Sequence, residues 1–189
     1  MLTATFKDTD KVIDITEYKH PRSEISKDGL VCLECGWPLY IKEGSVIIPH
    51  FCHMPHAPES CTAWKNESIE HDLGKRWVRD CLRREYKGKS GMIVELEKWI
   101  PEINQRADVL VTYPFGWQMA HEIQLSPIDI NEIKERTHGY ESAGIDVIWW
   151  LTETSKRYVE QWVREKFGQV FTIEIERHNE GYSSADFSF

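Results

Sequence analysis

Cysteine and histidine residues near the N-terminus have the types and spacing to bind a metal ion. Cys32 and Cys35 are separated by two residues and followed by Gly36. Two thiolates at this spacing can bind one zinc ion, and the glycine lets the backbone curl around it. Any two of three later residues could complete a tetrahedral site: His50, His53 and Cys61. A closed four-ligand site leaves no position for water, so this pattern predicts structural Zn²⁺.

Two other interpretations of Cys32 and Cys35 are open. They could be buried small residues, although the nearby histidines make this less favourable. They could form a thioredoxin-like redox pair, but no βαβ pattern follows them. The chain has five cysteines, an odd number, and its N-terminus lacks a signal-peptide pattern, so a disulfide framework is not expected.

A second candidate metal site is formed by oxygen ligands. Asp108 lies near the start of one predicted strand, and Glu122 and Gln124 lie near the end of the next. Strand side chains alternate, so Glu122 and Gln124 share a face, and a hairpin can bring Asp108 level with them. Oxygen ligands suit Mg²⁺ or Mn²⁺, which could polarise a phosphate and activate water. Alternatively, Glu122 pairs with Arg106, His121 or Lys134.

The helix expected from about residue 66 to 86 carries further polar candidates. Glu67, His71 and Lys75 recur every four residues and therefore share one face. Glu67 could add a metal ligand or orient a water, His71 could relay protons, and Lys75 could neutralise phosphate. The alternative is an ordinary solvated face. The core stripe is expected opposite this row, at Ile69, Leu73, Trp77 and Cys81.

The same helix predicts a local basic surface on an acidic protein. The formal charge is −8, which argues against a protein that coats nucleic acid nonspecifically. Cations nevertheless dominate between Lys75 and Lys89, and the candidate DNA-binding residues there are Arg76, Arg79 and Arg83. On a later helix, Arg136 and Tyr140 could contact the DNA backbone or brace the metal site. Solvated or packing roles are the alternatives.

The elements that must position these residues follow from hydrophobic periodicity. We expect a hairpin over residues 2–15, loops and short strands over 30–61, then the helix just described. Strands are predicted over 92–100, 107–113, 118–124, 145–151 and 170–175, and helices over 128–142 and 154–167. The near-continuous apolar run 145–151 is expected to lie centrally, covered on both faces. The fold class is α/β, with a mixed sheet flanked by helices.

Length and composition suit one full core and a small accessory module, with 189 residues and 41% apolar content. We expect an N-terminal hairpin and zinc-binding module over 1–63, a main domain over 64–177, and a flexible tail over 178–189. No apolar run is long enough to span a membrane, so a cytoplasmic protein without membrane insertion is expected.

Taken together, the ordered motifs resemble the competence protein CoiA-like nucleases of the PD-(D/E)XK superfamily. The resemblance covers about residues 30 to 152. It runs through the Cys32 and His50 segments, Glu67, His71 and Lys75, then Arg106-Ala107-Asp108, Glu122-Ile123-Gln124, Arg136 and Tyr140. It implies a restriction-endonuclease-like core with an N-terminal zinc-binding segment. It also implies a metal site on Asp108, Glu122 and Gln124, assisted by Glu67.

This sequence departs from the superfamily at Gln124, where a lysine is usual. Glutamine can hydrogen-bond or ligate, but it carries no charge to hold the attacking water. The leading hypothesis is a Mg²⁺- or Mn²⁺-dependent nuclease acting on DNA in uptake, recombination or processing, with recombination or uptake proteins as further candidate partners. The alternatives are a nuclease-fold DNA-binding or recruitment module with little activity, and a zinc-organised protein-interaction domain.

Overall fold

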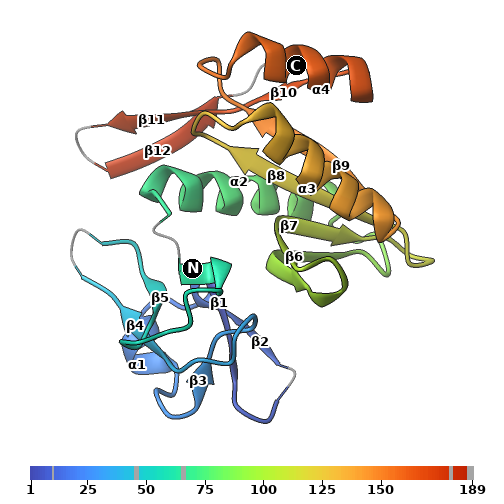
Figure 1. Cartoon of the computed structure of the whole chain (residues 1–189). Helices are drawn as coiled ribbons and strands as arrows, with labels where there is room; N and C mark the ends of the chain where they lie inside the picture. Colours follow the sequence, from blue (N-terminus) through green and yellow to red (C-terminus); the bar gives the residue numbers. More distant parts are fainter. Residues whose placement is uncertain (10, 45–46, 65–66, 179–180, 187–189) are drawn as a thin grey trace. The chain divides into compact units, whose positions relative to one another are not determined.

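The computed structural model describes residues 1–9, 11–44, 47–64, 67–178 and 181–186 of the chain (Figure 1). Its contacts divide the chain into two units, Met1–Ile69 and Glu70–Phe189. No helix within these described residues is long and apolar enough to cross a membrane.

The first unit is built from short strands. β1 (Thr3–Phe6) lies between β2 (Val12–Asp14) and β3 (Leu30–Val31), and β4 (Leu39–Lys42) pairs with β5 (His50–His53). All of these pairs are antiparallel. One short helix, α1 (Pro21–Glu24), and two 3-10 turns, η1 (Ile15–Glu17) and η2 (Thr62–Trp64), complete the unit. The expected hairpin is confirmed as β1 and β2; its turn includes Asp10, which lies outside the described residues.

The second unit is organised around a five-stranded mixed sheet in the order β10-β9-β8-β7-β6. β6 (Ile93–Ile100), β7 (Gln105–Thr112) and β8 (Gln118–Gln124) are antiparallel neighbours, with the short turn η3 (Pro101–Ile103) between β6 and β7. β9 (Ile145–Leu151) runs parallel to β8, and β10 (Phe171–Thr172) runs parallel to β9. The predicted mixed sheet and the predicted hairpin between β7 and β8 are confirmed.

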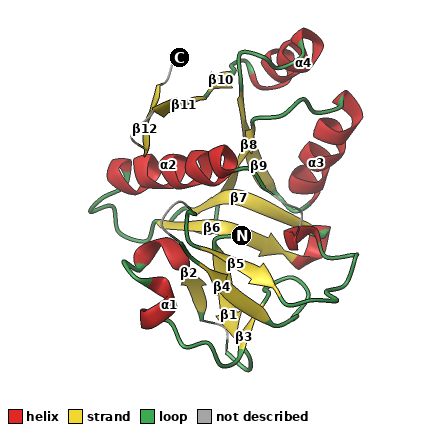
Figure 2. Cartoon of the chain, turned by 90° about the vertical axis from the view of Figure 1, so that its left-hand side faces the viewer, coloured by secondary structure: helices red, strands yellow, loops and turns green. Residues whose placement is uncertain are grey.

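Helices cover both faces of this sheet, with α2 (Ile69–Glu85) on one side and α3 (Ile130–Ser142) on the other (Figure 2). α3 begins after Asp129, whose side chain accepts a hydrogen bond from the Asn131 amide at 2.8 Å. It ends before Gly144, whose φ of +70° is the left-handed conformation expected of glycine there. α4 (Arg157–Phe167) ends in the same way at Gly168.

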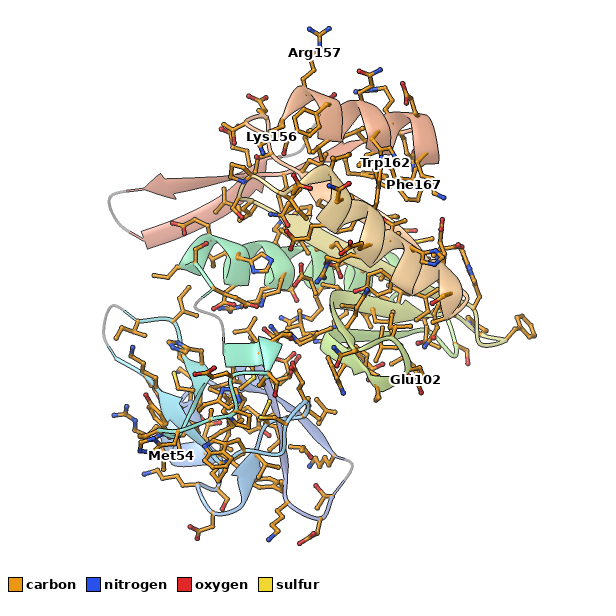
Figure 3. The ribbon with its side chains drawn as sticks, viewed as in Figure 1. Met54, Glu102, Lys156, Arg157, Trp162 and Phe167 are labelled. Atoms are coloured by element: carbon orange, nitrogen blue, oxygen red, sulfur yellow. The ribbon has the colours of Figure 1, made fainter. Side chains whose placement is uncertain are left out.

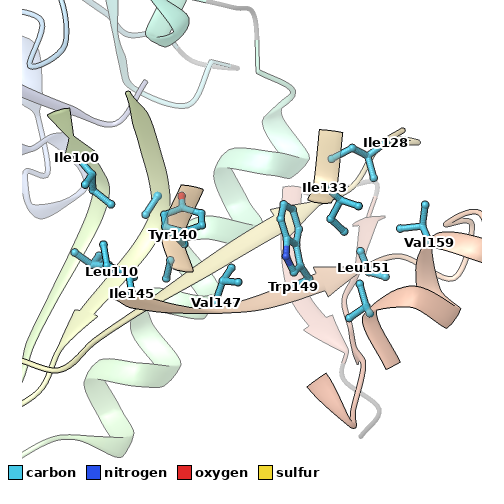
Figure 4. Close-up of a cluster of buried hydrophobic side chains, with 13 residues drawn as sticks. Ile100, Leu110, Ile128, Ile133, Tyr140, Ile145, Val147, Trp149, Leu151 and Val159 are labelled. Carbon is cyan, nitrogen blue, oxygen red and sulfur yellow. The ribbon is translucent and has the colours of Figure 1, made fainter. Parts of the chain in front are cut away.

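The main hydrophobic core lies between the sheet and α3 and α4 (Figure 4). β9 contributes one fully buried face to it, formed by Ile145, Val147, Trp149 and Leu151. The expectation that β9 is covered on both faces is confirmed only in part: on its other face Asp146 is exposed, while Ile148 and Trp150 are half-buried. Trp162 and Phe167 extend from α4 on the side toward α3 (Figure 3), where the Lys134 ammonium lies 5.9 Å from the Trp162 ring.

The buried face of α2 differs from the predicted stripe. Ile69 is 36% exposed, whereas the buried residues of the helix are Asp72, Gly74, Lys75, Val78 and Arg79. A β-carbon at Gly74 would lie 3.1 Å from the Ile123 side chain of β8, so the helix backbone packs closely against the sheet there. The stripe prediction is wrong because three charged residues of α2 take buried positions.

The chain continues beyond β10 as a hairpin of β11 (Glu174–His178) and β12 (Gly181–Asp186). Of the segment 178–189, the described residues are His178 and 181–186, which lie in this hairpin; the flexible tail stays a prediction. Residues 179–180 and 187–189 lie outside the described residues.

Candidate metal centres

Asp108 and Glu122 face each other where β7 and β8 stop pairing. The last paired residues at that end are Val109 and His121, and the same register places Asp108 opposite Glu122 one step further. Both carboxylates are largely buried, with exposed residue fractions of 8% and 3%. Two acidic side chains from neighbouring strands therefore meet at one end of the hairpin, as the sequence predicts.

Asp108 is held in place by both a strand and a helix. Its Oδ2 accepts a hydrogen bond from the Ile123 amide of β8 at 2.8 Å and lies 3.2 Å from His71 Nε2 of α2. The strand contact fixes the carboxylate between β7 and β8. The imidazole is within hydrogen-bond distance, so His71 can exchange a proton with groups at this centre.

Glu122 is held by two donors from α3. Arg136 donates to its Oε2, and the Tyr140 hydroxyl donates to its Oε1. Burial raises the pKa of Glu122, and the charge of Asp108 adds to this effect, while Arg136 and Tyr140 act in the opposite direction. In return, the Glu122 charge raises the pKa of Arg136, which keeps the guanidinium charged. The two predicted DNA-binding residues of α3 thus meet Glu122, and Tyr140 is fully buried.

Gln124 lies two residues after Glu122 and is half-buried. Its side-chain nitrogen donates to the Ser126 carbonyl oxygen at 2.6 Å and lies 3.1 Å from the Ser126 hydroxyl. Because these contacts occupy the nitrogen end of the amide, the carbonyl oxygen is the atom that Gln124 can offer to a cation.

A buried ionic cluster joins α2 to β6. Lys75 is fully buried, with its ammonium 2.6 Å from Glu97 Oε1 and 3.2 Å from Asp72 Oδ1. The β6–β7 register pairs Leu96 with Val109 and Lys98 with Ala107, which places Glu97 level with Asp108 between these two pairs. Carboxylate oxygens of Glu67, Asp72 and Glu97 lie within 4.8 Å of one another. Sequence reasoning missed Asp72 and Glu97, because the cluster joins Lys75 of α2 to a carboxylate of β6, a strand that no spacing in the sequence connects to the helix.

The three arginines predicted to bind DNA occupy different environments on α2. Arg79 is buried, and its guanidinium pairs with Asp80 at 2.8 Å. Arg76 is half-buried and Arg83 is exposed. Of these three predicted DNA-binding residues, Arg83 is therefore the one that is exposed to solvent.

In the first unit, four of the five predicted zinc ligands come together: Cys32, Cys35, His53 and Cys61. Cys32 and Cys35 flank a turn in which Gly36, at φ +68°, donates to the Cys32 carbonyl oxygen at 2.9 Å. Burial raises the pKa values of Cys32 and Cys61. Glu34 binds the backbone amide and hydroxyl of Thr62, which ties the turn to the segment that carries Cys61.

The spacing of these donor atoms fits a tetrahedral ion. With bonds of about 2.3 Å to sulfur and about 2.0 Å to nitrogen, sulfur atoms lie about 3.8 Å apart and sulfur lies about 3.5 Å from nitrogen. The Cys32 and Cys61 sulfurs are 3.9 Å apart. His53 Nε2 lies 3.5 Å from the Cys35 sulfur and 3.6 Å from the Cys61 sulfur. The cluster can therefore bind one metal ion through three thiolates and an imidazole.

His50 does not join this cluster. Its Nδ1 lies 2.7 Å from the Ile48 carbonyl oxygen. His50 and His53 are three residues apart in β5, so their side chains leave opposite faces of the strand. A strand predicted over residues 50–53 would have placed the two histidines on opposite faces, and would therefore have excluded one of them from the zinc site.

Two family models match this chain. The model of the competence protein CoiA nuclease-like domain matches residues 67–183, and that of the competence protein CoiA N-terminal domain matches residues 16–63. No curated protein and no solved structure matches the chain.

Proposed function

Because this chain belongs to the competence protein CoiA family and carries its nuclease-like domain, we propose that it is a metal-dependent deoxyribonuclease. It hydrolyses phosphodiester bonds of DNA in uptake, recombination or processing, and its second unit is a restriction-endonuclease-like core. The observation that carries the proposal is the opposition of Asp108 and Glu122 at the end of the β7–β8 hairpin.

The residues at this centre suit Mg²⁺ or Mn²⁺. Two facing carboxylates repel each other, and the Asp108 charge contributes to raising the pKa of Glu122. A divalent cation between them would relieve this repulsion. Each carboxylate oxygen has two lone pairs, so an oxygen of Glu122 that accepts from Arg136 or Tyr140 can still ligate. The cation, when bound, would polarise the scissile phosphate and lower the pKa of a water.

We assign roles in metal binding, proton transfer and positioning to the residues around the two carboxylates. Gln124 offers a carbonyl oxygen as a third ligand, and His71 accepts or returns a proton beside Asp108. Arg136 opposes the rise in the pKa of Glu122 and orients its carboxylate, and its partly exposed side chain can also meet a phosphate. We give Lys75 a positioning role, because it is fully buried and binds Glu97, the residue level with Asp108.

We further propose that Zn²⁺ occupies the site formed by Cys32, Cys35, His53 and Cys61. Four protein ligands complete a tetrahedron and leave no position for a reacting water, so this ion has a structural role. The first unit is built from short strands, and metal binding can contribute directly to the folding of such a unit.

The test is a cleavage assay on labelled single- and double-stranded DNA with Mg²⁺ or Mn²⁺. The isosteric variants Asp108→Asn and Glu122→Gln should lose metal-dependent cutting while their circular dichroism spectra stay unchanged. Glu132→Gln, which changes an exposed carboxylate on α3, is the matched control and should cut like the parent. Cutting by Asp108→Asn at the parental rate would reject the assigned centre.

A second candidate function is a nuclease-fold DNA-binding or recruitment module with little activity. Two observations favour it: Gln124 stands where the superfamily usually has lysine, and both oxygens of Glu122 are already bound by α3. Salt-sensitive DNA binding by the parent without turnover under Mg²⁺ or Mn²⁺ would select this function over the nuclease.

A further inference from the structure

The turn that joins β7 to β8 presents a fully exposed aromatic side chain. Phe115 is 109% exposed relative to its reference state, and Trp117 is 47% exposed. The turn begins at Tyr113, whose carbonyl oxygen accepts from the Gly116 amide at 3.0 Å. Pro114 and Phe115 are its two central residues, and Phe115 has a φ of +73°.

Phenylalanine at this position is unfavourable for the fold. A turn whose third residue has a positive φ normally takes glycine or asparagine there, because a β-carbon is strained in the left-handed region. Phe115 gains no burial to offset this strain, since its ring is fully exposed. Neither turn geometry nor packing therefore accounts for an aromatic residue at the tip.

The tip is rigidly supported by other aromatic rings. The Tyr113 and Trp117 rings lie 4.3 Å apart with an interplanar angle of 31°. Trp117 Nε1 donates to Asp146 Oδ2 at 2.8 Å, and the Tyr113 hydroxyl lies 2.8 Å from that of Tyr86. These contacts fix the turn to β9 and to the segment after α2, so Phe115 is presented from an ordered base.

The segment that supports the tip is basic. Residues 83–91 carry Arg83, Arg84, Lys87 and Lys89 against the single carboxylate of Glu85, and all five are exposed. The Lys89 ammonium lies 4.9 Å from the Tyr86 ring centroid and 3.1 Å from Glu85. At the tip itself, the carboxylate of Asp146 is hydrogen-bonded to Trp117. Exposed cations can bind the backbone phosphates of a nucleic acid, and an exposed aromatic ring beside them can stack on a base.

We propose that the β7–β8 turn is a binding site for single-stranded DNA, in which Phe115 stacks on an unpaired base and the 83–91 segment binds the backbone phosphates. The choice of DNA as the ligand rests on the proposed function. A paired base within a duplex offers no free face to Phe115, so the site selects unpaired strands. Five residue steps along β7 and into the turn separate Asp108 from Tyr113, which corresponds to about 17 Å, so the turn and the carboxylates lie at opposite ends of the hairpin.

The test compares Phe115→Ala with Tyr158→Ala, which removes a second exposed aromatic residue, on α4. Binding of the full-length proteins to a fluorescent 20-nucleotide oligothymidine is measured without added divalent metal. Phe115→Ala should weaken binding by about fivefold to a hundredfold, the contribution of one stacked base. Tyr158→Ala should bind like the parent. An oligomer of abasic sites keeps the phosphates without bases, and the parent and Phe115→Ala should bind it equally.

A further variant separates binding from folding. Phe115→Gly relieves the backbone strain, so its thermal midpoint should equal or exceed that of the parent while its affinity for oligothymidine falls. Equal oligothymidine affinities of the parent and Phe115→Ala would overturn the proposal. The proposal would also be overturned if Phe115→Ala weakened only the binding of anionic phospholipid vesicles, or only self-association measured by sedimentation. Because binding is measured without cleavage, inactive Asp108→Asn should still bind through Phe115, which distinguishes failure of this site from failure of the nuclease.

Discussion

His121 offers a test of how the sheet beneath the carboxylate centre responds to acid. It precedes Glu122 in β8 and is 3% exposed. Trp150 Nε1 donates to His121 Nδ1 at 3.1 Å, so the neutral ring must carry its proton on Nε2. Within the described residues, Nε2 is buried without a hydrogen-bond partner. A second proton on this ring would have to go to Nδ1, where it would displace the hydrogen bond from Trp150 and place a charge in a buried site.

Burial lowers the pKa of His121 from 6.5 to about 4. The folded pKa lies below the unfolded one, so the stability that His121 contributes is present above pH 6.5 and is lost as the pH falls toward 4. The full difference corresponds to about 3 kcal/mol, of which about 2 kcal/mol is lost between pH 7 and pH 5.

The perturbation is His121→Phe, which keeps a ring in the site and removes the proton. Urea unfolding of parent and variant is measured at pH 7 and pH 5. The parent should lose about 2 kcal/mol more than the variant over this range. His138→Gln, at an exposed position of α3, is the control and should follow the parent. Equal pH dependence of the parent and His121→Phe would refute the reasoning, as would a His121 ring that titrates near 6.5 by NMR.

Three further predictions concern single contacts. Cys61→Ser should release about one zinc per chain in elemental analysis, whereas Cys52→Ser, outside the cluster, should retain it; parent protein that holds no zinc when purified without chelator would contradict this. Tyr140→Phe removes a hydrogen bond to a buried carboxylate and should lower the free energy of unfolding by about 1.5–3 kcal/mol in urea; an unchanged value would show that the bond contributes nothing. Gly74→Ala should destabilise by about 1 kcal/mol in thermal unfolding, because the added β-carbon approaches the sheet to 3.1 Å; a stabilised variant would mean that α2 can move outward.

The carboxylate pair could be predicted from the sequence because its geometry is local. β8 and β9 have the predicted bounds, and one hairpin turn separates β7 from β8. Alternation along two adjacent strands is enough to align Asp108 with Glu122. The two contacts made by α3 are less local; bracing of the metal site was one of the roles that the sequence offered for Arg136 and Tyr140.

The buried face of α2 could not be predicted in the same way. Periodicity assigns apolar residues to the core, but Lys75 and Asp72 are buried because Glu97 of β6 neutralises the ammonium from another part of the chain. Nothing in the spacing of α2 indicates that partner. The result is a helix in which Ile69 is partly exposed and a lysine is fully buried.

The choice between zinc ligands depended on one unrecognised strand. The 30–61 segment was expected to contain loops and short strands, and that expectation left His50 and His53 equivalent. Once residues 50–53 form β5, the two side chains diverge and only His53 reaches the thiols. A single element therefore decided between ligands that composition and spacing could not separate.

The way α3 holds Glu122 has a consequence for the smallest fragment that could preserve the centre. Its two donors lie 14 and 18 residues downstream in the chain, one helical turn apart. A polypeptide ending after β8 would contain Asp108, Glu122 and Gln124 and still lack the groups that orient Glu122. α3 in turn packs on β9, so truncation before Leu151 would remove the surface that seats the helix. The last acidic-motif residue is Gln124, but the residues that orient and support Glu122 extend to Leu151, about thirty residues further along the chain.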